Sequence, residues 1–420
     1  MKRIVTFAVI LAAFFTLSSC SSDSVPLANL TVTLSVPTEV EGFTIDVPSS
    51  EVEVTLTNTV DNSISTAITD NSGIAIFADK AAGNYIISTS IIANVGVNII
   101  NLVGNDPVTL VAGEDASNIL TLVGSVKQED LIISEIYTCA PEFIGLSYLQ
   151  SKFIEIYNNT DKDLTTEGLI LSGIAGRSGV DGNREWSASL PIGEYVYGNN
   201  VLRFPQDQIK TIAPGEGIVI ALNAINYTDG LPVDKDPTKF ADLSNSDFEC
   251  YAVDYLQSIS SSGNPWFDSD NANVTNMEIL YMYNQNLGYS FINWATGGEA
   301  YVLYRNTDFL MSNDNLVVEP EDTADPQVQY LPLESKYIID GVCVLENSSA
   351  ANFRSLPSTV DASFTYCKED GGPGNSGISI IRLKDEDAST TANRTILIDT
   401  NDSGSDFTQV TDPTPHVYGE

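Results

Sequence analysis

The feature that most constrains this chain is an alternation of apolar and polar residues that recurs along most of its length. Segments such as "LTVTLSV", "VEVTLTN" and "KFIEIYNN" change polarity at nearly every position, and the apolar stretches after residue 20 are short and broken by Asn, Asp, Gly or Pro. Successive side chains of a β-strand point to opposite faces, so this period of two predicts half-buried strands. The sequence therefore predicts an all-β protein, in which only "DFECYAVDYLQSI", residues 247–259, has helical spacing.

The first twenty residues form a targeting segment. Two basic residues precede an apolar run that ends in "LSSC", and this run is shorter than the roughly 20 residues that a membrane-spanning helix needs. A small residue before a cysteine is typical of a lipobox. We therefore predict a signal peptide over residues 1–19, lipidation of Cys20, and a polar tether over residues 20–26. The lipid would anchor the chain in the outer membrane, on its periplasmic or its cell-surface face.

The net charge of the chain limits the classes of molecule that it can bind. Its 56 acidic residues outnumber 19 basic ones, which gives a formal net charge of −37. A surface of this kind repels nucleic acid and anionic lipid, so a nucleic-acid partner is excluded. Among common ligands, only metal cations are actively favoured.

Four cysteines remain after the lipidated one: Cys139, Cys250, Cys343 and Cys367. Export to an oxidising compartment permits disulfides, and four cysteines allow three pairings. Cys343 lies in the apolar strand "GVCVL" and Cys367 ends the strand "SFTYC", so these two are one possible pair. A zinc site is not expected, because the chain has no CxxC spacing and its one histidine is His416.

Residues 27–124 are expected to form the first domain. "VEVTLTN", "TDNSGIAIF" and "GNYIIS" follow one another there, and this succession resembles the prealbumin-like or carboxypeptidase-regulatory type of β-sandwich. The resemblance implies an immunoglobulin-like spacer or docking module without catalytic residues. It also implies that Phe77 and Tyr85 pack in the core.

Residues 130–420 are expected to form a second β-sandwich, after a polar link at 124–130. "ISEI", "FIEIYNNTDKDL", an apolar "LIL" strand, "FP" and "IAPGEGIVIA" occur there in order, and this series resembles the lamin-tail domain, which is an immunoglobulin-like sandwich. The segment is longer than that domain, so we expect long inserted loops at about 176–200 and 223–294. Pieces of the second insertion also resemble exported Bacteroidota lipoproteins of unassigned function, a family that implies no activity.

The hairpin "KFIEIYNNTDKDLTTEGLIL", residues 152–171, raises the question of a carboxylate site. Glu155, together with Glu135 of "IISEIY", could supply paired carboxylates for acid–base chemistry or cation binding. The alternative, which we favour, places each at a strand edge near the turn, where it accepts hydrogen bonds. Asn158 and Asp161 are then turn formers. No catalytic residue is predicted.

Two stretches contain oxygen ligands in a pattern that calcium loops use. "DTNDSGSDF" places Asp399, Asn401 and Ser403 at alternating positions before a glycine, but it lacks the closing glutamate of an EF-hand. "FDSDNAN" offers Asp268 and Asp270. Calcium is therefore the one cofactor left open, and a plain polar hairpin is the alternative.

Some residues of predicted loops are candidates for sugar binding or for O-glycosylation. Trp186, Trp266 and Phe267 lie in probable insertion loops and could stack on sugar rings, although large apolar residues are more often buried. "DSV" with Ser24 and "DTA" with Thr323 resemble the signal for protein O-glycosylation in Bacteroidota.

The sequence as a whole favours a lipid-anchored binding protein of the cell envelope that is not an enzyme. By analogy with other lipid-anchored outer-membrane proteins of Bacteroidota, we expect the specific role to be the capture of ligand for a TonB-dependent outer-membrane transporter. A surface structural or adhesive protein, or one that binds a surface glycan, is an alternative. A carboxylate-based glycan hydrolase is another, and it would need two acids in a cleft.

Overall fold

The computed structural model describes most of the chain from residue 26 onward. The described residues are 26–40, 43–60, 63–95, 98–127, 130–142, 147–174, 195–259, 268–282, 292, 294–295, 297, 299–318, 329–347, 354–357, 359–368 and 374–418. These residues form an all-β protein with a few short helices, which confirms the predicted fold class. None of the helices in this part of the chain is long and apolar enough to span a membrane.

The first β-sandwich has a three-stranded and a five-stranded sheet. The smaller sheet has the order β6 (Ile74–Lys80), β1 (Ala28–Ser35) and β9 (Ala116–Thr121). The larger has the order β10 (Val123–Lys127), β8 (Asn98–Leu110), β7 (Gly83–Val95), β4 (Glu53–Asn58) and β5 (Ile64–Ile68). A small hairpin pairs β2 (Glu39–Val40) with β3 (Phe43–Thr44).

The core of this sandwich follows from the alternation along its strands. In β1 the even-numbered residues from Ala28 to Leu34 are buried and those between them are more exposed. Phe77 and Tyr85 are buried in the same core, as predicted. Strand β10 lies within the predicted polar link, so the sheet of the first sandwich reaches Lys127.

The second sandwich contains two larger sheets. One has the order β19 (Thr275–Asn276), β18 (Phe248–Glu249), β17 (Gly217–Ala221), β12 (Phe153–Asn158), β11 (Leu131–Tyr137), β26 (Ser379–Arg382) and β27 (Phe407–Val410). The other has the order β22 (Val317–Val318), β23 (Gln329–Glu334), β15 (Tyr195–Arg203), β14 (Leu169–Ile174), β21 (Glu299–Arg305), β24 (Ile338–Leu345) and β25 (Thr365–Tyr366), with β20 (Glu278–Met282) also paired to β15.

The central strands of the second sandwich are buried on both faces. Ile154 of β12 and Leu171 of β14 belong to the core between the two sheets. The outer faces are covered as well: Tyr137 and Phe153 lie in one apolar cluster and Cys343 in another. Polar side chains on these strands are therefore enclosed, which matters for the carboxylates described below.

The helices and remaining short strands lie in the connections of the second sandwich. They are α1 (Ser147–Gln150), α2 (Val253–Ile259), α3 (Glu386–Ala392), α4 (Ser403–Asp406), η1 (Pro237–Lys239), η3 (Asn313–Asn315), η4 (Ser335–Tyr337), β13 (Leu164–Thr165) and β16 (Thr211–Ile212). Helix α2 lies within the predicted helical stretch, whereas α3 was not predicted. The carboxylate of Asp385 caps α3 by accepting from the backbone N–H of Ala388.

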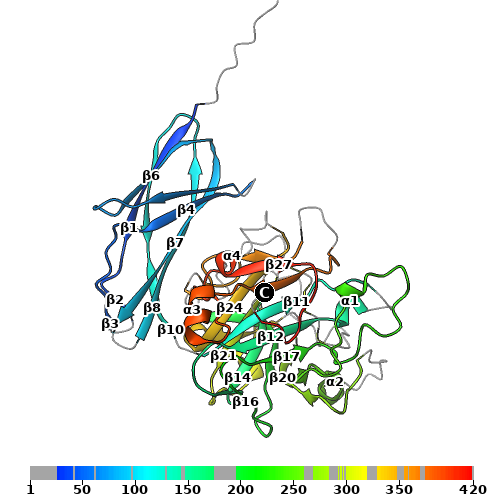
Figure 1. The fold of residues 1–420 in the computed structure, drawn as a ribbon. Helices are drawn as coiled ribbons and strands as arrows, with labels where there is room; N and C mark the ends of the chain where they lie inside the picture. Colours follow the sequence, from blue (N-terminus) through cyan, green and yellow to red (C-terminus); the bar gives the residue numbers. More distant parts are fainter. Residues whose placement is uncertain are drawn as a thin grey trace, which may run out of the picture.

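Figure 1 shows the two sandwiches side by side, with the blue and cyan strands of the first standing next to the green-to-red second. The side chain of Asn105 on β8 donates to the carbonyl of Ala362, which links the two bodies. Of the predicted insertions, residues 176–194 fall outside the described residues, whereas residues 195–200 begin β15. Within 223–294, β18 and β19 extend one sheet and β20 joins the other, so this segment contributes to the scaffold.

Candidate functional site

Two buried glutamates lie side by side in the seven-stranded sheet. Strands β11 and β12 pair antiparallel, and Glu135 is the register partner of Glu155. Directly opposed residues of antiparallel strands have their Cβ atoms about 4.5–5.5 Å apart. Glu135 is 1% exposed and Glu155 is 0% exposed. The structure therefore brings together the two carboxylates that the sequence offered as a pair.

The C-terminal segment covers this pair; we call residues 411–418 the C-terminal strap. The backbone N–H of Thr414 donates to Glu135 Oε1 at 3.0 Å, and the backbone N–H of His416 donates to Glu155 Oε1 at 2.6 Å. Beyond them, the ring of Tyr418 packs on Tyr157 at 4.6 Å between centroids. A Cβ added at Gly217 would lie 2.7 Å from the backbone carbonyl oxygen of Ile156 and 2.7 Å from the Tyr418 hydroxyl, so glycine is required where the strap packs on β17.

Two serine hydroxyls of the sheet also donate hydrogen bonds to the two glutamates. Ser379 on β26 donates to Glu135 Oε1 at 2.5 Å, and Ser134 on β11 donates to Glu155 Oε2 at 3.0 Å. Burial raises the pKa of Glu135 to about 7, although these hydrogen bonds oppose the shift. Burial, followed by the neighbouring charge of Glu135, raises the pKa of Glu155 to about 8. Near neutral pH the two groups therefore hold at least part of their protons.

The expectation that these glutamates sit at strand edges was wrong for both. Strand β11, which carries Glu135, lies between β12 and β26 in the seven-stranded sheet. Strand β12 is central, since β11 and β17 flank it, and the strap that covers its outer face comes from the other end of the chain. Asn158 behaves as predicted for a turn former. Its side chain accepts from the N–H of Thr160 and donates to the carbonyl of Ile212. Asp161 is exposed in the turn.

The pair predicts how stability depends on pH. A carboxyl group whose folded pKa exceeds its unfolded pKa stabilises the fold fully below the unfolded value, and this contribution is lost as the pH rises through the folded value. We expect the free energy of unfolding to fall by several kcal/mol between about pH 5 and about pH 8, because both carboxyl groups lose their protons in this range. Urea unfolding at a series of pH values measures this, and Glu155→Gln should flatten the slope. The exposed Glu167→Gln is the control, and an unchanged slope in Glu155→Gln would contradict the prediction.

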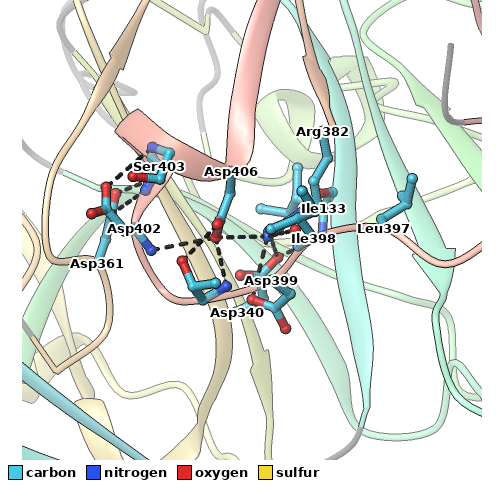
Figure 2. Close-up of polar contacts among 12 residues, drawn as sticks. Ile133, Asp340, Asp361, Arg382, Leu397, Ile398, Asp399, Asp402, Ser403 and Asp406 are labelled. Carbon is cyan, nitrogen blue, oxygen red and sulfur yellow. Dashed lines mark hydrogen bonds and ion pairs between the residues drawn. The ribbon is translucent and has the colours of Figure 1, made fainter. Parts of the chain in front are cut away.

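A second polar cluster surrounds a buried arginine at the edge of the sandwich (Figure 2). Arg382 on β26 is 2% exposed and pairs with three aspartates: Asp340 at 2.8 Å, and Asp399 and Asp406 at 3.3 Å each. Its Nε also donates to the carbonyl of Ile133 at 2.8 Å. The guanidinium therefore connects β11, β24, β26 and the 399–406 loop.

This loop is the first of the two predicted calcium stretches. The carboxylate of Asp399 faces Arg382, and the hydroxyl of Ser403 donates to Asp361 at 2.7 Å (Figure 2). Asn401 adopts a left-handed backbone conformation with φ 57°. Arg382 supplies a fixed positive charge where the loop pattern suggested a bound cation. Calcium binding at this loop stays a prediction.

The second predicted calcium stretch is also hydrogen bonded within the protein. Asp268 accepts from the N–H of Ala252 at 2.8 Å, and Asp270 accepts from the side chain of Asn276 at 3.0 Å. Burial raises the pKa of Asp268 to about 7. In the described part of the chain, no group of three or more His, Cys, Asp or Glu side chains is arranged to hold a metal ion.

We expect EDTA to leave the melting temperature unchanged. Asp399 already has a counter-ion in Arg382, and Asp268 already accepts backbone hydrogen bonds, so neither needs calcium to be neutralised. Differential scanning calorimetry before and after chelation measures this. A loss of several degrees that calcium restores and magnesium does not would establish a calcium site.

The disulfide in the structure differs from the Cys343–Cys367 pair that the sequence suggested. Cys139 and Cys367 form a disulfide with their Cα atoms 6.5 Å apart, while Cys250 and Cys343 are free and buried. The proposed pairing of Cys343 with Cys367 was therefore wrong. Their strands β24 and β25 are neighbours, but Cys343 faces the outer apolar cluster whereas Cys367 and Cys139 face the core between the sheets.

Sequence reasoning missed a polar contact inside the core. Lys152, 0% exposed, donates to the carbonyl of Trp294, and burial lowers its pKa to about 8. Near it, Glu299 of the opposite sheet accepts from the N–H of Ala295 at 2.8 Å and from the hydroxyl of Tyr301 at 2.7 Å. The sequence does not indicate this buried hydrogen bond, because a single lysine before a strand is usually a solvent-exposed charge.

Several predicted site residues lie outside the described residues, so the structure does not place them. These are Cys20, Ser24, Trp186, Trp266, Phe267 and Thr323.

One protein-family model matches part of the chain. Residues 213–414 match the family model described as "Protein of unknown function (DUF4876)". The match begins after β16 and includes β17 of one sheet and β21 of the other, so it takes in part of each sheet of the second sandwich. None of the curated proteins matches the chain.

Solved structures extend the DUF4876 similarity to the fold. A DUF4876 family protein from Bacteroides thetaiotaomicron is 21% identical, with a TM-score of 0.54, over 92% of this chain and 96% of that one. A DUF3823 family protein from Parabacteroides merdae is 12% identical, with a TM-score of 0.17, over 36% and 67%. The first likeness concerns the fold alone, and the second is too weak to bear on fold or function. The lamin-tail and prealbumin-like resemblances stay predictions.

Proposed function

We propose that this chain is a lipid-anchored binding protein of the bacterial cell envelope, without catalytic activity, that captures ligand for an outer-membrane transporter. The lipobox at Cys20 supports the anchor, and β-sandwiches are scaffolds whose connecting loops commonly carry binding residues. The high acidity agrees with a soluble body outside the cytoplasm and disfavours contact with anionic lipid.

The enclosure of the glutamate pair is the observation that supports a role without catalysis. A glycan hydrolase needs two carboxylates that reach a substrate, with space between or beside them for the sugar and water. Glu135 and Glu155 are buried, and backbone groups of the C-terminal strap donate to both. Their raised pKa values follow from this burial, so here they accompany a structural role.

Glycan binding is the second candidate, and its strongest argument comes from the sequence. Sugar recognition by stacking needs exposed aromatic rings, and Trp186, Trp266 and Phe267 are the residues predicted to supply them. The first sandwich has a groove of about 740 Å³ between residues 44–52 and 91–93 of β7. Its lining is aliphatic and polar, with Ile45, Val47 and Asp46 among the lining residues, so this groove does not favour stacking on a sugar.

Affinity purification of the native lipidated chain from membranes tests the proposed function. We expect an outer-membrane barrel to co-purify in amounts comparable to the chain, and Cys20→Ser to lose it because the unlipidated chain is not held at the membrane. Recovery of the chain alone would contradict the transporter role. Sugar release from a polysaccharide by the wild type, abolished by Glu155→Gln, would instead establish the hydrolase.

A further inference from the structure

The edge strand β5 lacks the features that usually protect a sheet edge. β5 ends the five-stranded sheet, and its segment "SISTAIT", residues 63–69, contains neither charge nor proline. Its register with β4 runs from Glu53↔Ile68 to Thr57↔Ile64 without a bulge. Natural proteins protect such edges with charges, prolines or bulges, because unpaired backbone groups attract another strand.

The edges of the smaller sheet differ from each other. Strand β6 ends in Asp79 and Lys80, whereas β9 is uncharged and is preceded by Glu114 and Asp115, much as the β5 segment is followed by Asp70. The side chain of Lys80 donates to the hydroxyl of Ser65 on β5 at 2.7 Å, and this side of the strand is the one that packs against the core. The strand β5 is therefore one of two uncharged edge strands among those that the structure describes in this sandwich, in a chain whose net charge is −37, and β5 is the one that lies in the larger sheet.

Backbone geometry shows which groups β5 presents outward. The carbonyl of Ser63 accepts from Asn58, and the N–H of Thr69 donates to Val52, so the backbone groups of both residues point toward β4. Because these directions alternate along a strand, the backbone groups of Ile64, Thr66 and Ile68 point to the open edge. The side chains of these three residues share the outer face, where Ile64 and Ile68 are each 66% exposed.

The outward-facing positions of β5 are symmetric about Thr66, with isoleucine at both 64 and 68. Two antiparallel copies centred there place Thr66 opposite itself and Ile64 opposite Ile68 of the second copy. All three positions present outward N–H and C=O groups, so every pair in this register can exchange two hydrogen bonds. Threonine pairs and pairs of β-branched residues are favourable across strands. A two-fold contact also requires a surface that complements itself, and β5 meets this requirement.

From these features we infer that β5 is a homodimer contact, through which two copies of the chain join their five-stranded sheets edge to edge. The absence of charge on this edge lets two strongly acidic chains approach there. The remaining repulsion acts over a Debye length of about 8 Å at physiological ionic strength, so added salt strengthens the dimer. This inference does not depend on the proposed ligand or transporter.

A disulfide across the two-fold axis tests the contact in the full chain within the exporting cell. Opposed residues of a hydrogen-bonded antiparallel pair have Cα atoms about 5.5 Å apart, which suits a disulfide. We expect Thr66→Cys to give a band of twice the monomer mass on a non-reducing gel, which reductant removes. Ile119→Cys on β9, 68% exposed in the wild type, is the matched control and should stay monomeric. Failure of Thr66→Cys to cross-link, or equal cross-linking in both variants, overturns the inference.

A charge exchange tests the register independently. In sedimentation equilibrium of the lipidated chain in detergent, Ile64→Lys with Ile68→Lys should lower the association constant at least tenfold, because like charges then face each other. Ile64→Lys with Ile68→Glu places opposite charges across the axis and should restore association. Equal behaviour of these two variants, or a wild type that is monomeric at every concentration and salt, overturns the inference. The positions are exposed, and melting curves verify that each variant folds.

Discussion

Replacing Arg382 by methionine should lower the free energy of unfolding by about 3–5 kcal/mol, because removing one partner of a buried ion cluster leaves the others uncompensated. Asp340, Asp399 and Asp406 would then be buried without their cation, and two backbone carbonyls would lose a donor. Burial already raises the pKa of Asp406 to about 6 with the arginine present. Urea unfolding of the purified variant at neutral pH measures the effect.

Arg203→Met is the matched control for that experiment. Arg203 pairs with Glu278 at 2.6 Å, but the two side chains are 25% and 44% exposed. A solvated pair of this kind contributes about 0–1 kcal/mol. If Arg382→Met and Arg203→Met lower the free energy of unfolding by similar amounts, the buried cluster contributes no more to stability than an exposed ion pair does. Arg382→Lys keeps the charge but cannot form the planar fork, so an intermediate loss is expected.

Removing the disulfide is the second large change, and Cys139→Ala with Cys367→Ala should cost about 2–5 kcal/mol. The bond joins residues 228 apart in sequence, so it restricts the unfolded chain over most of the second sandwich. In the native state it connects the segment that follows β11 to the residue after β25. Thermal unfolding with and without reductant measures this, since only the wild type should respond to reduction.

The free cysteine Cys250 provides the control for packing. Cys250→Ala removes a buried thiol without breaking a cross-link, and its loss should be on the order of 1 kcal/mol. A double variant that is no less stable than Cys250→Ala would contradict the role given to the disulfide. The role of the disulfide would also be contradicted if reductant left the wild-type melting temperature unchanged. Thiol labelling must then show that the bond is open.

Local patterns were sufficient to predict the fold class. The alternation in β1 and the turn at Asn158 depend on neighbours in sequence, and both were predicted correctly. The burial of Phe77 and Tyr85, which the prealbumin-like resemblance implied, is also confirmed. The short helix α3 escaped prediction because its sequence, EDASTTA, has no large apolar residue that could show a helical spacing.

The surroundings of the glutamate pair could not be predicted for a physical reason. The hydrogen bond from His416 to Glu155 spans 261 residues, and that from Thr414 to Glu135 spans 279. Nothing near Glu155 in sequence signals that a distant segment will cover it. The disulfide partner of Cys367 and the three aspartates around Arg382 depend in the same way on which strands become neighbours.

The strand order determines where this chain can be cut. Strands β11 and β12 lie between β17 and β26 in one sheet, and β14 and β15 lie between β23 and β21 in the other. All four precede residue 213, where the family match begins. A fragment limited to residues 213–414 would lack the middle of both sheets and would leave Cys367 without Cys139. We therefore expect that the segment matched by the family model does not fold alone, and expression of the second sandwich should start before β11.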